Sequence, residues 1–196
     1  MKHLVIILFL IFTSCKNKPK TKIDTQTETH IETESETESE NVIDKSVSEI
    51  WNNYIESNPE FKEEEIPESW YFHNNREDAN RLAELTLNGK KKAASGLYFW
   101  YKEAKADLPK IGTKHIITDF DGRAKAIIEI KKVDTIPFNL ISEVYAEMDM
   151  GTKIEPLKKW KKAHWAFFAS TMEESGEKPN EEMLIVREWF ETIWIE

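Results

Sequence analysis

The chain has 196 residues, of which 40% are apolar and 32% are charged, and its 27 basic and 36 acidic side chains give a formal net charge of -9. This composition excludes a fully disordered chain, a polytopic membrane protein and a collagen-like fibre, and the length fits one domain with tails. The acidic balance also argues against a protein that binds long nucleic acids through counterion release, because that mechanism requires a basic face.

The first part of the chain is typical of an export signal. Nine consecutive apolar residues occupy positions 4–12, fewer than the roughly 20 that a membrane-spanning helix needs. The run therefore predicts the apolar region of a signal peptide over residues 1–14. Thr13 and Ser14 precede Cys15, and this arrangement resembles the bacterial lipobox, in which the cysteine carries the lipid. An ordinary signal peptide with an incidental cysteine is the alternative interpretation.

Residues 15–45 are expected to form an acidic, disordered tether. Segment 24–41 has Ile31 as its only aliphatic residue, so it cannot bury enough apolar surface to offset its ordering entropy. A low-complexity binding tail is the alternative. Lysines rather than acidic residues follow Cys15. We therefore expect a lipid-anchored protein of the bacterial cell envelope that faces the periplasm.

The remaining residues, 46–196, are expected to fold as one α+β domain. Apolar residues at helical spacing, with flanking caps and stops, predict helices at about 46–57, 77–87, 139–148 and 156–174, with Ser46 or Ser48 as the first cap and Asn139 as the third. Runs rich in Ile, Val and aromatic residues predict strands at 93–101, 115–120, 123–133 and 183–195. Asp121-Gly122 is expected to join the middle two strands as a hairpin.

The order of these elements indicates the architecture. Within 123–133, apolar residues at alternate positions predict one dry side and one largely solvent-facing side. Helices and strands do not alternate regularly along the chain. This order favours a small mixed β-barrel or curled sheet with helices outside, rather than a doubly wound sheet.

Several blocks of residues between Trp70 and Trp194 carry a resemblance. They are Ala79-Asn80-Arg81-Leu82-Ala83-Glu84-Leu85, Asn88-Gly89-Lys90-Lys91, Leu108-Pro109-Lys110-Ile111-Gly112, Ile136-Pro137-Phe138 and the run from Trp160 to Phe168. In order and spacing they resemble the larger bacterial branch of the ASCH domain family. The resemblance implies a PUA-like small mixed β-barrel with flanking helices, similar to modules that read nucleobases or modify RNA. One small branch looks like an amidohydrolase that removes the acetyl group from N4-acetylcytidine.

The family hallmark is Gly-x-Lys-x-x-Thr at a helix-to-strand turn. Gly89 and Lys91 match it, whereas Ala94 stands where the threonine, the proposed nucleophile of the hydrolase branch, is usual. Alanine has no hydroxyl and cannot attack an acyl carbon. Ser95 is adjacent, but neighbouring side chains of a strand face opposite ways. We therefore expect Ser95 to replace the threonine only through a bulge or a register slip.

The resemblance also implies an acidic partner for the lysine. It falls on Glu147 or Asp149, with Asp149 the better match. A lysine desolvated at a barrel mouth pairs with a carboxylate, and such a pair can orient a polar base edge or help to deprotonate a hydroxyl. The candidate catalytic residues are Lys91, Ser95 and Asp149. The candidate ligand-binding residues are Lys90, Trp70, Phe72 and Glu147, with the two aromatic rings available to stack on a base.

Each candidate also has a structural interpretation. The lysines could belong to a solvated turn after a helix, the acids could be surface groups, and the aromatic rings could be core. His164 lies in the apolar stripe of helix 156–174, where a buried histidine with a satisfied partner is more usual than a catalytic one. The histidines show no metal-ligand spacing and Cys15 is the only cysteine. We therefore expect no metal, no disulfide and no cofactor.

Three functions remain open. The first is a lipid-anchored module that binds a nucleoside, a nucleotide or a short RNA, and the missing threonine makes binding better supported than turnover. The second is an amidohydrolase acting on an acylated nucleoside such as N4-acetylcytidine, through Lys91, Ser95 and Asp149. The third is a non-catalytic envelope module that binds a protein partner.

Overall fold

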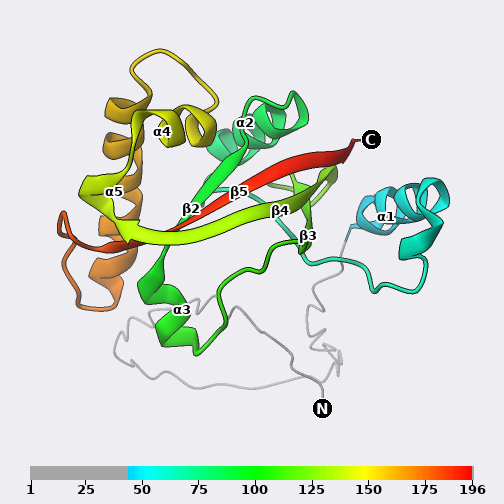
Figure 1. Ribbon diagram of the computed structural model, residues 1–196, viewed down its shortest axis with the longest axis horizontal. Coiled ribbons are helices and arrows are strands. Elements are labelled where there is room, and N and C mark those ends of the chain that lie inside the picture. Colours follow the sequence, from blue (N-terminus) through cyan, green and yellow to red (C-terminus); the bar gives the residue numbers. More distant parts are fainter. Residues whose placement is uncertain (1–43, 196) are drawn as a thin grey trace, which may run out of the picture. The chain divides into compact units, whose positions relative to one another are not determined.

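The computed structural model describes residues 44–195 (Figure 1). The predicted signal peptide, Cys15 and the predicted tether up to residue 43 lie outside the described residues. Within 44–195, no helix is both long enough and apolar enough to cross a membrane.

A five-stranded sheet runs through the described part of the chain, in the order β1-β3-β4-β5-β2. Its strands are β1 (Ser69–Trp70), β2 (Ala93–Leu97), β3 (Lys114–Thr118), β4 (Ala124–Pro137) and β5 (Leu184–Ile195). β1 pairs in parallel with β3, and the other neighbouring strands are antiparallel. β2 therefore forms one edge of the sheet, and the candidate site lies at this edge.

Helices pack on both faces of the sheet. They are α1 (Lys45–Ser57), α2 (Arg76–Leu87), α3 (Tyr98–Ala104), α4 (Glu143–Met150) and α5 (Pro156–Glu174), with 3-10 turns η1 (Pro59–Phe61) and η2 (Phe138–Leu140). Figure 1 shows α4 and α5 gathered on one side of the long β4–β5 ribbon. The predicted α+β class is confirmed, and α2 and α5 lie where the sequence predicts them.

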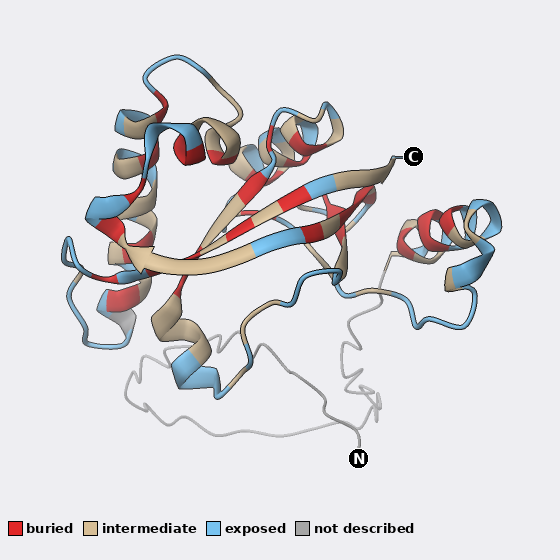
Figure 2. Ribbon diagram, viewed as in Figure 1, coloured by how far each residue is buried: buried red, intermediate tan, exposed pale blue. Residues whose placement is uncertain are grey.

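Three apolar clusters form the core. One holds α4 and α5 against the β2 edge, a second holds α2 and Phe72 against the opposite face, and a third holds α1 near the start of β4. Figure 2 shows the buried residues on the strands and on the helix sides that face them. A sheet covered on both faces explains why apolar residues are not confined to alternate positions.

Helix α1 covers a side of β4 that the sequence predicted to face solvent. The side of strand 123–133 that was expected to face solvent carries Ile127, which is completely buried. Ile50 and Trp51 of α1 pack over it. Alternation along one strand cannot reveal a helix that arrives from elsewhere in the chain.

The cap of α1 also differs from the prediction. Asp44, and not Ser46 or Ser48, caps the helix, because the Asp44 carboxylate accepts the Ser46 N–H at 2.9 Å. The Ser46 hydroxyl instead accepts the Ala124 N–H at 2.8 Å. Ser46 therefore ties α1 to β4.

The predicted strand 93–101 is too long. β2 ends at Leu97, and the aromatic run that follows forms α3. Trp100 of α3 packs edge-on against Phe167 and Phe168 of α5, with ring centroids 5.9 and 5.7 Å apart. Aromatic residues favour strands when neighbours are unknown, but here packing against α5 favours the helix.

The helix predicted from Asn139 begins later. A 3-10 turn covers Phe138–Leu140, and α4 starts after Ser142, whose hydroxyl accepts the Tyr145 N–H at 3.2 Å. The Phe138 ring is buried 5.0 Å from the ring of Trp160, which fixes the chain before the helix starts. As a result, Asp149 lies in the last turn of α4.

Candidate functional site

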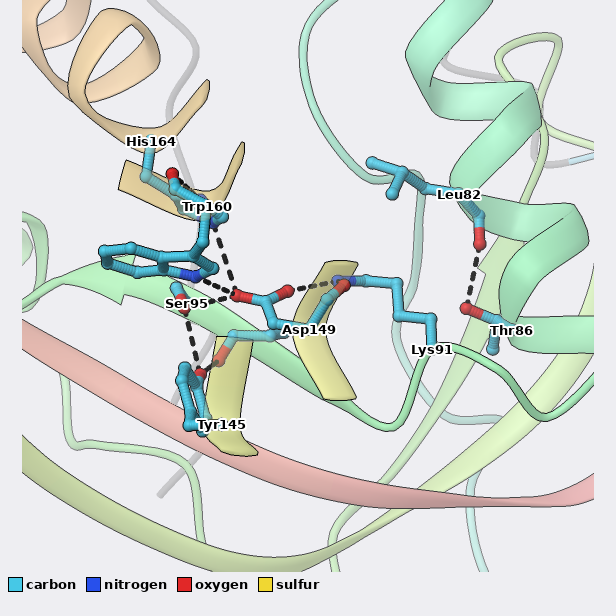
Figure 3. A network of polar contacts seen from close by, with 9 residues as sticks. Leu82, Thr86, Lys91, Ser95, Tyr145, Asp149, Trp160 and His164 are labelled. Atoms are coloured by element: carbon cyan, nitrogen blue, oxygen red, sulfur yellow. Dashed lines mark hydrogen bonds and ion pairs between the residues drawn. The ribbon is translucent and has the colours of Figure 1, made fainter. Parts of the chain in front are cut away.

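Lys91 and Asp149 meet at the β2 edge of the sheet (Figure 3). α2 ends in a turn through Gly89, at φ 62°, and the Lys91 N–H then donates to the Leu85 carbonyl at 3.0 Å. The Lys91 Nζ donates to Asp149 Oδ1 at 2.5 Å and to the Asp149 carbonyl oxygen at 2.9 Å. The two side chains are 4% and 2% exposed. Residues 58 positions apart therefore form a buried ion pair.

The second carboxylate oxygen of Asp149 receives donors from two further elements (Figure 3). Oδ2 accepts the Ser95 hydroxyl of β2 at 2.6 Å and the Trp160 indole N–H of α5 at 2.7 Å. His164 Nε2, one turn further along α5, lies 3.3 Å from the same oxygen. With Lys91, four side chains surround one carboxylate, which leaves it little capacity to accept from a ligand.

These contacts keep the Asp149 carboxyl ionised. Burial by itself raises its pKa, but the charges and hydrogen bonds of Lys91 and His164 outweigh burial and hold the pKa well below its usual range. His164 Nδ1 also lies 3.0 Å from the Trp160 carbonyl oxygen, so both ring nitrogens face acceptors. A carboxylate with so low a pKa is a weak base. It suits a fixed counterion for Lys91 better than a general base.

Ser95 reaches Asp149 without the bulge that the sequence suggested. β2 pairs with β5 in continuous register from Ala93 to Leu97. Ser95 therefore faces the same side as those two residues, which α4 and α5 cover. Ala94, at the threonine position, faces the opposite side of the sheet. Ser95 contacts Asp149 without a bulge because Asp149 approaches from the side on which Ser95 lies.

Tyr145 of α4 completes the polar network. Its hydroxyl donates to the Ala94 carbonyl at 2.5 Å and lies 2.9 Å from Ser95 Oγ. Burial raises the pKa of Tyr145 well above its usual value, so the phenol keeps its proton. Ser95 is thus held between a neutral phenol and the ionised Asp149.

Two candidate ligand-binding residues lie outside this network. Lys90 is exposed to solvent. The Glu147 side chain is 41% exposed and lies 3.7 Å from the amine of Lys153. Of the two acids that the sequence offered as a partner for Lys91, the structure brings only Asp149 to it.

The two candidate aromatic residues lie next to the ion pair. The Lys91 Nζ is 4.7 Å from the centroid of the Phe72 ring. Trp70 meets Phe72 edge-on, with ring centroids 4.9 Å apart. Phe72 is buried, whereas Trp70 is partly exposed. The ammonium group therefore contacts an aromatic ring as well as a carboxylate.

Several residues of the site were not among the candidates. They are Tyr145, Trp160, His164 and, on the other face of the sheet, Glu188. Spacing is the signal for the first three, because Tyr145 precedes Asp149 by four positions and Trp160 precedes His164 by four, which places each pair on one helix face. For Glu188, the signal is an acid inside a strand of mostly apolar residues.

The Lys91–Asp149 ion pair is almost completely buried. Among residues 44–195, no group of three or more His, Cys, Asp or Glu is placed to hold a metal ion. Two surface hollows, of about 370 and 460 Å³, are lined by other residues than Lys91 and Asp149. A ligand can reach the buried amine only if a covering side chain moves.

A mixed sheet with helices on both faces and a lysine at its edge, paired with the acid of a later helix, defines a PUA-like α+β domain. The chain belongs to the ASCH domain family, whose model matches residues 68–194. It is similar to the crystal structure of an ASCH domain from Lactobacillus crispatus JV V101, at 29% identity and a TM-score of 0.70, over 77% of this chain and 96% of that chain.

The chain is also similar to a second solved structure. A protein from Enterococcus faecalis V583 is 30% identical, with a TM-score of 0.69, over 76% of this chain and 88% of that chain. No curated protein matches the sequence. The predicted family and the predicted PUA-like fold are confirmed.

Proposed function

We propose that this ASCH domain binds a small ligand that contains a nucleobase. The ligand is a nucleoside, a nucleotide or a short RNA. The observation that carries the proposal is the set of donors on Lys91. An ammonium group has three hydrogens. Two of them are directed at Asp149, and within 44–195 no hydrogen-bond acceptor takes the third. A carbonyl oxygen or ring nitrogen of a base can accept it.

The surroundings of Lys91 suit a flat ligand. Asp149 holds the amine in place, and aromatic faces such as those of Phe72 and Trp70 stack on bases. Because Phe72 is buried against the amine, binding in this proposal requires its ring to turn away and a base to replace it. The net charge of -9 favours a small ligand over a long polynucleotide.

Trp70→Leu is expected to weaken ligand binding by about tenfold, because base stacking on an aromatic ring contributes roughly 1–3 kcal/mol. Calorimetry with nucleosides, nucleotides and oligoribonucleotides measures this change. Tyr71→Leu is the matched control, because the neighbouring ring is 38% exposed and packs on Phe120 at 5.1 Å instead. If the unmodified protein binds nothing in this panel, nucleobase binding is excluded and the protein-partner alternative gains support.

An amidohydrolase is the second candidate, because Ser95 donates a hydrogen bond to Asp149 at 2.6 Å beside Lys91. A hydroxyl group that donates a hydrogen bond to a carboxylate is arranged as a nucleophile is beside its general base. The lowered pKa of Asp149 opposes that role. We therefore expect the protein to release no more cytidine from N4-acetylcytidine than Ser95→Ala does, as measured by chromatography. Faster release that is lost in both Ser95→Ala and Lys91→Met would establish the hydrolase instead.

We also propose that Cys15 carries a lipid that holds the domain at the bacterial cell envelope. The support is the apolar run at 4–12 and the small residues before Cys15. In bacteria fed a labelled fatty acid, the full chain is expected to incorporate the label and Cys15→Ser to incorporate none. Equal labelling of the two chains, or no label in either, would contradict lipidation at this cysteine.

A further inference from the structure

A buried acid, Glu188, lies on the face of the sheet opposite to Ser95. Glu188 of β5 pairs with Ala94 of β2 and with Val133 of β4. Directly paired residues face the same side of a sheet, and Glu188 is 9% exposed there. Ala94 occupies the threonine position of the family motif. A carboxyl group therefore stands beside the place where a hydroxyl is usual.

Among the residues that the structure describes, no cationic side chain pairs with Glu188. The Tyr101 hydroxyl donates to its Oε1 at 3.3 Å, which is long for a bond between two oxygens. Within residues 44–195, no other hydrogen bond or ion pair involves this carboxyl. Burial, together with the charge of Asp149, raises the pKa of Glu188 to about 7 against the opposing effects of Tyr101 and Lys91. Buried acids without a structural partner are candidates for a functional role.

Glu188 lies on the side of the sheet on which Phe72 and Trp70 pack, and the Phe72 ring contacts the Lys91 ammonium group. The residue paired with Glu188 on each neighbouring strand packs in the same apolar cluster as Phe72 and Trp70. A base at these two rings would therefore meet an ammonium donor and a carboxyl acceptor.

We propose that the Glu188 carboxylate accepts a hydrogen bond from an exocyclic amino group, so that the site selects amino-bearing nucleobases over their oxo counterparts. This inference rests on the proposed function and names its ligand class. An ionised carboxylate has only acceptors, and a base oxygen at the same place would present only lone pairs to it. A site built to accept from an amino group rejects an analogue without that group.

The test is a comparison of two matched ligand pairs, cytidine with uridine and adenosine with inosine. Each amino-bearing member is expected to bind the full chain at least about tenfold more tightly at pH 8, because a hydrogen bond to a charged group is stronger than one between neutral groups. In Glu188→Leu, which keeps most of the volume and removes the acceptor, the ratio is expected to fall to about one. Calorimetry gives both ratios.

The preference is also expected to depend on pH. Because the Glu188 pKa is about 7, cytidine affinity is expected to rise between pH 6 and pH 8 as the carboxylate forms. Glu188→Leu is expected to lose this rise. Tyr101, Lys91 and Asp149 are the titratable groups that act on Glu188. They are retained in the variant, so any slope that they cause persists there.

Thermal unfolding tests the raised pKa of Glu188 in the absence of a ligand. The folded-state pKa of about 7 lies above the ordinary 4.5, so ionisation opposes folding and the protein loses stability as pH rises through this range. The Tm of Glu188→Leu relative to the unmodified protein is expected to increase by about 5 °C between pH 5 and pH 8. A Tm difference that is the same at both pH values would contradict the raised pKa of Glu188 and, with it, the expected rise in cytidine affinity between pH 6 and pH 8.

The outcomes separate the two proposals. No binding of any nucleoside, nucleotide or oligoribonucleotide overturns the proposed function and its ligand class together. Binding without preference within the pairs, or a preference that persists in Glu188→Leu, overturns only the role of Glu188.

Discussion

Asp149→Asn is expected to lower the free energy of unfolding by about 3–5 kcal/mol, the usual effect of breaking a buried ion pair from one side. Asparagine has nearly the same size as aspartate, so the loss of stability measures the effect of removing the negative charge. The Lys91 side chain is 4% exposed, so its ammonium group would remain buried without a counterion. Ser95 and Trp160 would also lose a charged acceptor. Urea unfolding followed by circular dichroism measures the change.

Glu147→Gln is the matched control for this prediction. It removes a carboxylate from the same helix, but that side chain is 41% exposed, so the change is expected to stay within about 0.5 kcal/mol. Combining Asp149→Asn with Lys91→Met is expected to recover part of the loss, because the second change removes the unpaired charge. Equal effects of Asp149→Asn and Glu147→Gln would show that the buried pair contributes no more than a surface acid.

The contribution of Asp149 also depends on pH. Its folded-state pKa lies below the ordinary 3.8, so the stabilisation is present above that value and is lost as pH falls toward the folded-state value. The unmodified protein and Asp149→Asn are therefore expected to approach one another in stability at strongly acidic pH.

Trp160→Phe is expected to lower the free energy of unfolding by about 2–4 kcal/mol. The indole is completely buried, with its ring 5.0 Å from Phe138 and 4.2 Å from His164. Phenylalanine leaves a cavity and also removes the N–H that donates to Asp149 at 2.7 Å. Each loss contributes on the order of 1–2 kcal/mol.

Trp165→Phe on the same helix is the control, because it makes the same substitution at a tryptophan that does not donate to Asp149. Trp165 is partly exposed and packs on Phe138 at 5.4 Å, and within residues 44–195 its indole N–H has no hydrogen-bond partner. The same substitution is expected to lower the free energy of unfolding there by about 1 kcal/mol or less. Equal losses at both tryptophans would mean that the bond to Asp149 adds no stability.

Local signals in the sequence predicted much of the fold. A proline in the first turn and apolar residues at helical spacing mark α5, and the structure has this helix at Pro156–Glu174. The turn at Asp121-Gly122 joins β3 to β4 as predicted, with Gly122 at φ 82°. Motif spacing also led to Lys91 and Asp149, which the structure brings together. Their functional roles stay predictions.

Elements that depend on distant packing were predicted less well. The aromatic run after Leu97 would suit a strand by itself, yet Trp100 packs on α5 and the run is a helix. Ile127 alternates as an outward residue, yet α1 covers it. In each case the deciding contact comes from a part of the chain that a local pattern does not contain.

The sequence by itself indicated the α+β class, because turns and helical periodicity depend on residues that are close together in the chain. Its resemblance to the family gave Lys91, with Glu147 or Asp149 as the acid. Only the tertiary structure decided which face of β2 meets Asp149. That choice depends on where α4 begins and how it packs, and it makes Ser95, and not Ala94, the partner of the carboxylate. It likewise placed Glu188 beside Ala94, because strand pairing between distant segments leaves no trace in either segment alone.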